Sequence, residues 1–267
     1  MKRPKELPDF GDPPLDEVVL GVQFEPIPAY KSIDANAVWE LFRSEFPNVE
    51  EQPPIAPVFE TFGGMTPQAG FQFHFGPIPP ATRLWFVSPD GSHLLQFQPD
   101  RFLLNWRKHQ GITPYPRFEQ VSASFLENLV RLSNHIEKEK SFKIEVNQVE
   151  ISYINIITVK EFSEIGDWIA IWKALNLNIE GVNMAFPEVI LDPEGRPSAR
   201  LHHEITSAVT PDGSSKALRL VLTYRGKPPG RGIEEATRFM AEGRIHIVNR
   251  FAELTTEHAH RIWKRLG

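Results

Sequence analysis

Several stretches of the chain alternate between apolar and polar residues, which is the pattern of β-strands with one buried face. In the first of them Val18, Leu20, Val22 and Phe24 share one face, and Gln23 falls on the other. The same alternation predicts further strands at residues 58–62, 71–75, 83–87, 93–97, 102–106, 143–157, 200–209 and 217–224. These strands predict antiparallel sheets with one apolar and one polar face.

Apolar residues three and four positions apart predict helices between the strands. The clearest stripe lies in residues 117–138, where Phe118, Val121, Phe125 and Leu129 would pack against a sheet. Less regular stripes predict further helices at residues 34–46, 163–175 and 232–254 and around Ile262.

The order of elements is the same in both halves of the chain: a strand, a short helix, several antiparallel strands and a long helix. The turns at residues 88–92 and 210–214 both contain Pro-Asp-Gly-Ser and fall at equivalent places in this order, which predicts a duplication. The alternative is that such turns and element orders recur by chance. The fold class predicted is α+β, with two duplicated β-α-β(3–5)-α units, antiparallel sheets and long packing helices.

The predicted organisation is an extended arm at residues 1–14, a first α+β unit at 15–140 and a second at 141–267. Two arrangements would satisfy this order. One is saddle-like, as in the TATA-binding protein, and the other is helix-grip-like, with a sheet wrapped around one long helix. A likeness of element order does not transfer function.

Composition narrows the class of protein. The chain has 267 residues, of which 41% are hydrophobic, and its 19 Phe and 6 Trp supply a packed core. The 29 basic and 34 acidic residues give a net charge of -5, which disfavours a general nucleic-acid binder because phosphate neutralisation needs cations. The absence of Cys excludes disulfides, thiol nucleophiles and Cys-based zinc sites.

The expected location is the cytoplasm. The first fifteen residues are charged and rich in Pro, and they lack the apolar stretch of a signal peptide. No apolar run in the sequence approaches the length of a membrane span, so we expect no membrane partner.

Both ends of the chain carry sequence patterns that resemble a known family. Residues 13–24 read Pro-Pro-Leu-Asp-Glu-Val-Val-Leu-Gly-Val-Gln-Phe, and the tail carries Phe251, Leu254, Thr255 and Trp263. These patterns resemble a sporadically distributed bacterial and archaeal family of unknown function and similar length. The resemblance brings no catalytic residues with it. The patchy distribution of the family implies mobile gene cassettes, such as phage-defence or toxin–antitoxin modules.

The sequence contains none of the sharp catalytic motifs sought. Neither a G-x-S-x-G elbow nor a G-x-G-x-x-G loop after a strand is present. His202, His203 and Glu204 are adjacent in a predicted strand, so His202 and Glu204 share a face without forming H-E-x-x-H. We interpret them as polar pairing, and we predict no catalytic residue, no cofactor and no metal site.

The polar face of the strands is the first candidate site. Its ligand- or partner-binding candidates are Gln72, His74, Gln148, Glu150, His202, Glu204 and Arg219. Mixed rows of amide, imidazole and guanidinium groups suit a ligand or a partner, whereas the alternative interpretation is a face that is merely hydrated.

A glycine-rich loop before the helix of residues 232–254 is the second candidate. Arg225, Lys227 and Arg231 lie in or beside this loop, and free N–H groups at a helix start favour an anion. Glu234 and Glu235 in the first helical turn would oppose an anion, and the alternative is a solvated connector.

Three functions follow in order of preference. The first is a non-enzymatic binding protein that recognises a macromolecular partner, a protein above all, through its sheet face or terminal helix. The second is a sensor or enzyme for a phosphorylated small molecule or nucleotide, which would use the loop from Arg225 to Arg231. The third is nucleic-acid binding on the sheet face, which the net charge disfavours. A homodimer is expected on general grounds, because twofold dimers are the commonest oligomers.

Overall fold

The computed structural model describes residues 7–63, 82–108, 114–173, 178–210 and 212–266. The first half contains β1 (Asp9–Phe10), β2 (Leu15–Phe24), α1 (Asp34–Phe42), β3 (Asn48–Gln52), β4 (Arg83–Val87), β5 (His93–Gln98), β6 (Arg101–Arg107) and α2 (Phe118–Lys140). The second half contains β7 (Val146–Thr158), α3 (Ile165–Trp168) between two short 3-10 turns, β8 (Asn183–Leu191), β9 (Pro197–Val209), β10 (Lys216–Gly226), α4 (Ile233–Leu254), α5 (Glu257–Ile262) and β11 (Arg265–Leu266).

The main sheet is antiparallel and has nine strands in the order β3-β4-β5-β6-β2-β7-β10-β9-β8. The α+β class is therefore confirmed. The central pair is β2 and β7. Next to β2 lies β6, followed outward by β5, β4 and β3, and next to β7 lies β10, followed outward by β9 and β8. Duplication, the unit boundaries and saddle-like curvature are compatible with this order and stay predictions.

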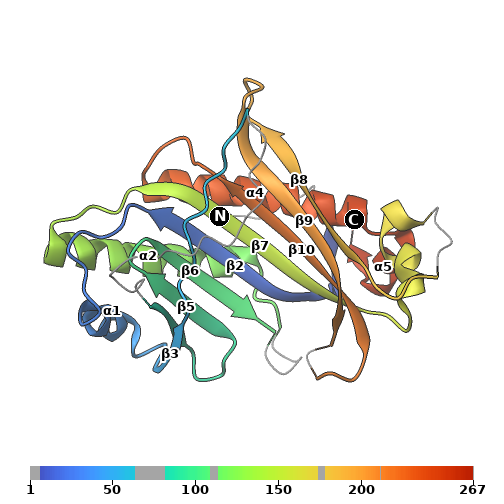
Figure 1. The fold of residues 1–267 in the computed structure, drawn as a ribbon, viewed down its shortest axis with the longest axis horizontal. Coiled ribbons are helices and arrows are strands. Elements are labelled where there is room, and N and C mark those ends of the chain that lie inside the picture. Colours follow the sequence, from blue (N-terminus) through green and yellow to red (C-terminus); the bar gives the residue numbers. More distant parts are fainter. Residues whose placement is uncertain (1–6, 64–81, 109–113, 174–177, 211, 267) are drawn as a thin grey trace.

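The helices α2 and α4 cover one face of the sheet (Figure 1). The alternation seen in the sequence explains why, because Val18, Leu20 and Val22 of β2 all point into the core beneath them. On α2, Phe125 stacks on Phe102 of β6 with ring centroids 6.1 Å apart. The opposite face of the sheet is left for other contacts.

The helix α4 approaches the sheet closely at a glycine. A Cβ atom at Gly243 would lie 2.8 Å from Cγ of Tyr224 and 2.9 Å from Cγ2 of Ile151, distances that side chains do not tolerate. Tyr224 also stacks against His246, one turn along α4, at 5.6 Å between ring centroids. Gly243 therefore sets how deeply α4 lies against β7 and β10.

The N-terminal arm is extended from residue 7 onward and is attached to the C-terminal end of the chain. β1 pairs with β11 in a separate two-stranded sheet. Phe10 packs edge-on against Phe251 of α4 at 5.4 Å and against Trp263 at 6.3 Å. Among the described residues, no helix is long and apolar enough to cross a membrane.

The expected match between the two Pro-Asp-Gly-Ser turns is wrong. The turn at residues 88–92 joins β4 to β5, whereas the turn at residues 210–214, of which Pro211 lies outside the described residues, joins β9 to β10. Since β6 and β10 both lie beside the central pair, the place that corresponds to the β4–β5 turn is the β8–β9 turn. That turn also has the Pro-x-Gly sequence, and both Gly91 and Gly195 have positive φ.

Three element predictions also need correction. Residues 58–62 form no strand, and β3 lies before them at Asn48–Gln52. The helix expected at residues 163–175 is broken into α3 and two 3-10 turns. The strand β8 was not predicted because Pro187 interrupts its pattern, yet an edge strand tolerates a proline. The strand expected at residues 71–75 lies outside the described residues.

We predict that Phe125→Ala lowers the free energy of unfolding by about 3–5 kcal/mol, because it removes a buried ring from between α2 and β6. Denaturant unfolding measures this loss. Val130→Ala on the exposed side of the same helix is the control and should change stability by less than about 0.5 kcal/mol. Equal losses in the two variants would show that the stripe does not pack as described.

Candidate functional site

The face of the sheet opposite α2 and α4 gathers the polar side chains that the sequence singled out. Glu150 on β7, Arg225 on β10 and Arg200 on β9 are direct neighbours in register and therefore point to the same side. Two rows further along β9 lies Glu204, which shares this side with His202 as predicted. The full set of described candidates on this face is Gln148, Glu150, His202, Glu204, Arg219 and Arg225, whereas Gln72 and His74 lie outside the described residues.

A segment of the chain itself crosses this face. Residues 53–62, which we call the strap, follow β3 and run over the sheet without forming helix or strand (Figure 1). Pro53, Pro54 and Pro57 explain the extended course, because proline fixes φ near −65° and offers no N–H to a neighbouring strand. The strap shows which chemistry the face can bind.

Two glutamines hold the backbone of the strap by paired hydrogen bonds. Gln98 of β5 accepts from the N–H of Ile55 at 2.9 Å and donates to its carbonyl at 3.0 Å. Gln23 of β2 accepts from the N–H of Val58 at 3.1 Å and donates to its carbonyl at 2.7 Å. Each side-chain amide thus makes both hydrogen bonds that a neighbouring β-strand would make.

The spacing of these contacts follows from the sheet. Gln98, Arg101, Gln23 and Gln148 form one row across β5, β6, β2 and β7. The step from β5 to β2 covers two strand spacings, about 10 Å, and three residues of an extended chain cover about the same distance. When its amide is oriented to satisfy both of its polar atoms, Gln148 accepts from the N–H of Glu60 at 3.3 Å.

The carboxylate of Glu60 anchors the far end of the strap. Its side chain is only 6% exposed and lies against three cationic or imidazole groups. It forms an ion pair with Arg200, lies 2.7 Å from Nε2 of His202 and 3.5 Å from Nη1 of Arg225. Arg200 also donates to the carbonyl of Thr61 at 2.6 Å. One carboxylate position is therefore recognised together with the backbone that follows it.

The electrostatics of this anchor favour the ionised carboxylate. Burial acts to raise the pKa of Glu60, but hydrogen bonds from His202 and Arg200 outweigh it and hold the pKa below its ordinary value. Arg225 is shared, because its Nε also lies 2.6 Å from the carboxylate of Glu150. Arg200 and Arg225 therefore bind the carboxylate of Glu60, and Glu150 offsets part of their charge, so the site keeps little excess positive charge.

The strap does not pack tightly on the sheet. A cavity of about 130 Å³ lies between them, lined by Gly21, Gln23, Ile55, Val58, Leu103, Gln148, Glu150 and Arg225 among others. The apolar side chains of Val58 and Phe59 are 40% and 53% exposed, so the strap buries little of its apolar surface. Hydrogen bonds and one ion cluster, rather than apolar burial, hold the strap in place.

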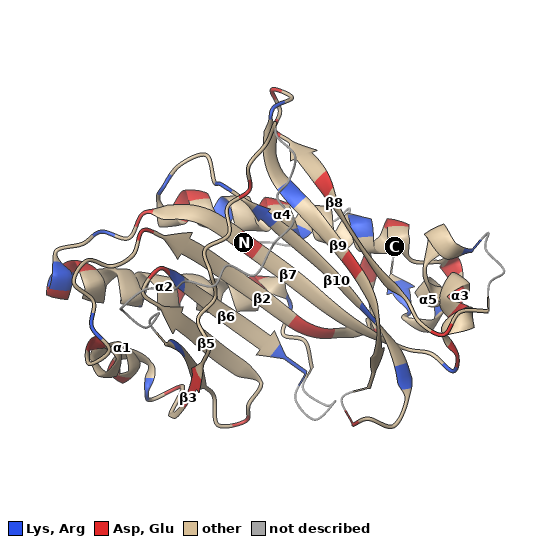
Figure 2. Ribbon diagram, in the orientation of Figure 1, with Lys and Arg blue, Asp and Glu red and all other residues tan. Residues whose placement is uncertain are grey.

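The part of the face on β4, β5, β6 and β2 carries a connected hydrogen-bond network, whereas Glu204 on β9 is exposed to solvent and Arg219 on β10 is half-buried. Arg83 and Trp85 donate to Gln96 at 2.7 and 3.1 Å, and Gln96 donates to Asn105 at 2.8 Å. Asn105 donates in turn to Glu17 at 2.6 Å, and burial raises the pKa of that carboxyl. Figure 2 shows acidic and basic residues interspersed over these strands, so no large patch of one charge forms.

The loop proposed for anion binding has carboxylate partners of its own. Arg225 lies on the sheet face beside Glu150, and Arg231 pairs with Glu145 at 3.0 Å. Of these three cations, Lys227 alone is exposed and forms no ion pair with a described residue. The Glu235 side chain occupies the loop, since a Cβ at Gly230 would lie 2.7 Å from its Cγ. The geometry therefore favours a connector, and the phosphate-binding hypothesis gains no support from it.

Four residues of this site are not among the site candidates that the sequence singled out: Gln23, Gln98, Glu60 and Arg200. Glu60 lies in residues 58–62, for which a strand was predicted, and its only signal is a single charge in an apolar run that prolines keep extended. Among the described residues, no three His, Asp or Glu side chains lie close enough together to hold a metal ion.

Comparison with known proteins adds no relative. No protein-family model matches the chain, and no curated protein is similar enough to count as a match. The resemblance of the two ends of the chain to a sporadic prokaryotic family stays a prediction, and the site rests on its geometry.

Proposed function

We propose that this is a non-enzymatic binding protein whose polar sheet face holds an extended segment of a partner polypeptide. The strap occupies that place when no partner is bound. The observation that carries the proposal is the pairing of Gln98 with Ile55 and of Gln23 with Val58, each through both backbone groups. Side-chain amides about 10 Å apart match the backbone groups of residues three positions apart in an extended polypeptide.

The same geometry disfavours a nucleic acid. A phosphate backbone offers only hydrogen-bond acceptors. The side-chain oxygens of Gln98 and Gln23, which are acceptors too, would then have no donor. Acidic groups also share the face, because Asp100 lies beside Arg101 and Glu150 beside Arg225. Phosphates would be repelled by these carboxylates, which also pair with Arg101 and Arg225.

The contacts define the chemistry of the partner segment. It needs a backbone N–H at the positions of Ile55 and Val58, and a carboxylate at the position of Glu60. Proline fits the positions of Pro53, Pro54 and Pro57, where none of the described contacts uses an N–H. We therefore expect an extended, proline-containing segment with a glutamate two residues after the second amide-paired position.

The strap is suited to exchange with such a segment. It buries little apolar surface, and the cavity beneath it means that a better-fitting segment gains contacts that the strap lacks. A tethered segment nevertheless competes with an effective concentration of the order of millimolar, so the resting protein should bind free peptides weakly. Membership of a mobile defence or toxin–antitoxin cassette is the biological setting that the sequence resemblance adds to this proposal.

We predict that a peptide of residues 52–63 binds a full-chain variant in which residues 53–62 are replaced by a Gly-Ser stretch of equal length. Fluorescence anisotropy should give binding at least tenfold tighter to this variant than to the wild type, because the tethered strap no longer competes. A Glu60→Lys peptide should bind at least tenfold more weakly, since it places a cation against Arg200. A Phe59→Ala peptide is the matched control and should bind nearly as well, because Phe59 is exposed.

Three results would contradict the proposal. The first is a folded Gly-Ser variant that does not bind the peptide. The second is equal binding of the Glu60→Lys and unmodified peptides. The third is binding of single-stranded DNA or RNA on this face in preference to the peptide, with the steep salt dependence of phosphate contacts.

A second prediction concerns pH. Because the pKa of Glu60 is lowered in the folded protein, its carboxylate stabilises strap docking fully above its ordinary pKa of 4.5, and this contribution is lost as pH falls through the lowered value. Amide hydrogen exchange, corrected for its intrinsic pH dependence, should show Ile55 and Val58 losing protection below about pH 4. In Glu60→Gln the step should vanish, with the β7 amide of Ile151 as the internal reference. The same acid step in the variant would rule out Glu60 as its cause.

A further inference from the structure

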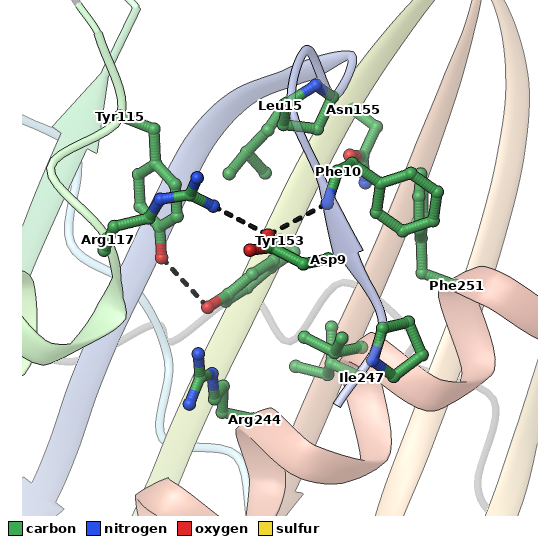
Figure 3. Close-up of a pocket in the computed structure, with 13 residues that line it drawn as sticks. Asp9, Phe10, Leu15, Tyr115, Arg117, Tyr153, Asn155, Arg244, Ile247 and Phe251 are labelled. Atoms are coloured by element: carbon green, nitrogen blue, oxygen red, sulfur yellow. Dashed lines mark hydrogen bonds and ion pairs between the residues drawn. The ribbon is translucent and has the colours of Figure 1, made fainter. Parts of the chain in front are cut away.

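A second cavity lies on the other side of the sheet, beneath the N-terminal arm. Its volume is about 70 Å³ (Figure 3). Phe10 and Leu15 of the arm and β2 close one side, Ile247 and Phe251 of α4 close another, and Tyr153 of β7 forms the floor. It is separate from the strap, because Tyr153 points toward the helices while its neighbour Ser152 points to the polar face.

The walls of this cavity are apolar and fixed. Phe10, Leu15, Ile247 and Phe251 are all buried, and Phe10 is held edge-on against Phe251. Pro13 adds a further apolar contact from the arm. A ligand that fills this space must therefore be apolar over most of its surface.

One corner of the cavity is polar. The hydroxyl oxygens of Tyr115 and Tyr153 lie 3.1 Å apart, so the pair uses one of its two protons and the other is left for a third group. Burial raises the pKa of both hydroxyls, which keeps them protonated at neutral pH. In Figure 3 the side chain of Arg244 rises from α4 toward the Tyr153 hydroxyl. The corner therefore presents hydrogen-bond donors to the cavity.

The charges around this corner are already balanced. Nη1 of Arg244 lies 3.1 Å from the carboxylate of Glu119, and Nη1 of Arg117 lies 2.9 Å from that of Asp9. Nε of Arg244 is buried and has no hydrogen-bond partner among the described residues. Its N–H group can therefore still donate a hydrogen bond, although Glu119 already balances the charge of Arg244. An added carboxylate would lose its hydration without gaining a free cation, whereas a neutral acceptor would lose little.

We propose that this cavity binds a small neutral molecule that is apolar except for one carbonyl oxygen. The carbonyl oxygen accepts a hydrogen bond from the Tyr115–Tyr153 pair, and the apolar part packs against Leu15, Ile247 and Phe251. A cavity of about 150 Å³ accepts a benzene ring, so this one, at about half that volume, encloses about three non-hydrogen atoms, and the rest of a larger ligand lies toward its open side. Arg117, which is exposed, marks the side on which a longer ligand would leave the cavity.

The test uses butanone and two probes of similar size with the full-length protein. One is the alkene in which a methylene group replaces the carbonyl oxygen of butanone, and the other is butyrate. Titrations followed by the NMR signals of the Leu15 and Ile247 methyl groups give the affinities and locate the site. We expect butanone to bind in the millimolar range and butyrate at least tenfold more weakly, while the alkene gives the affinity of the apolar walls alone.

The double variant Tyr115→Phe, Tyr153→Phe keeps both rings and removes both hydroxyls. We expect this variant to bind butanone at least fivefold more weakly than the wild type does, while the affinity of the alkene stays within about twofold, which shows that the cavity is intact. Butyrate binding as tightly as butanone, or equal affinities of the wild type and the variant for butanone, would overturn the proposal. The proposal is also overturned if butanone causes no saturable shift of the Leu15 and Ile247 methyl signals in the wild type. This result does not depend on whether the variant folds.

Discussion

The alternation of side chains along antiparallel strands is the constraint on which the rest of the structure depends. The inner strands of the nine-stranded sheet send every second residue toward α2 and α4, and the residues between them must point to the other side. Apolar residues occupy the first set, so the polar rows on the second are a geometric consequence. The geometry does not determine which polar residues occupy these positions. Side-chain amides and guanidinium groups predominate where the sheet contacts the strap.

The central strand β7 belongs to both proposed sites. Gln148 and Glu150 reach the strap or its anchor, while Tyr153 reaches the cavity beneath the arm. The two sites are thus only a few residues apart on one rigid strand but face opposite sides of the sheet. Each would take a different chemistry: an extended polypeptide with a carboxylate on one side, and a small neutral carbonyl compound on the other.

Periodicity alone predicted the strands and helices whose patterns are strong, and it predicted that Gln148, Glu150, His202 and Glu204 would share a face. It could not predict the role of Glu60, because no local pattern says that an extended segment returns across a sheet formed by residues far away in sequence. The strand β8 was not predicted for a related reason. Pro187 is tolerated there because β8 lies at the edge of the sheet, and no local pattern shows which strand is at the edge. The tyrosine pair joins residues 38 positions apart, and only the fold brings them together.

The hydrogen bonds that hold the strap have a consequence for proteolysis. Chymotrypsin cleaves after aromatic residues, and Phe59 is exposed between the contacts made by Val58 and Glu60. The protease needs the backbone on both sides of the cleaved bond for its own hydrogen bonds, and in the docked strap Gln23 and Arg200 hold that backbone. Cleavage after Phe59 therefore requires the strap to leave the sheet, and its rate measures how often this one segment opens while the rest of the domain stays folded.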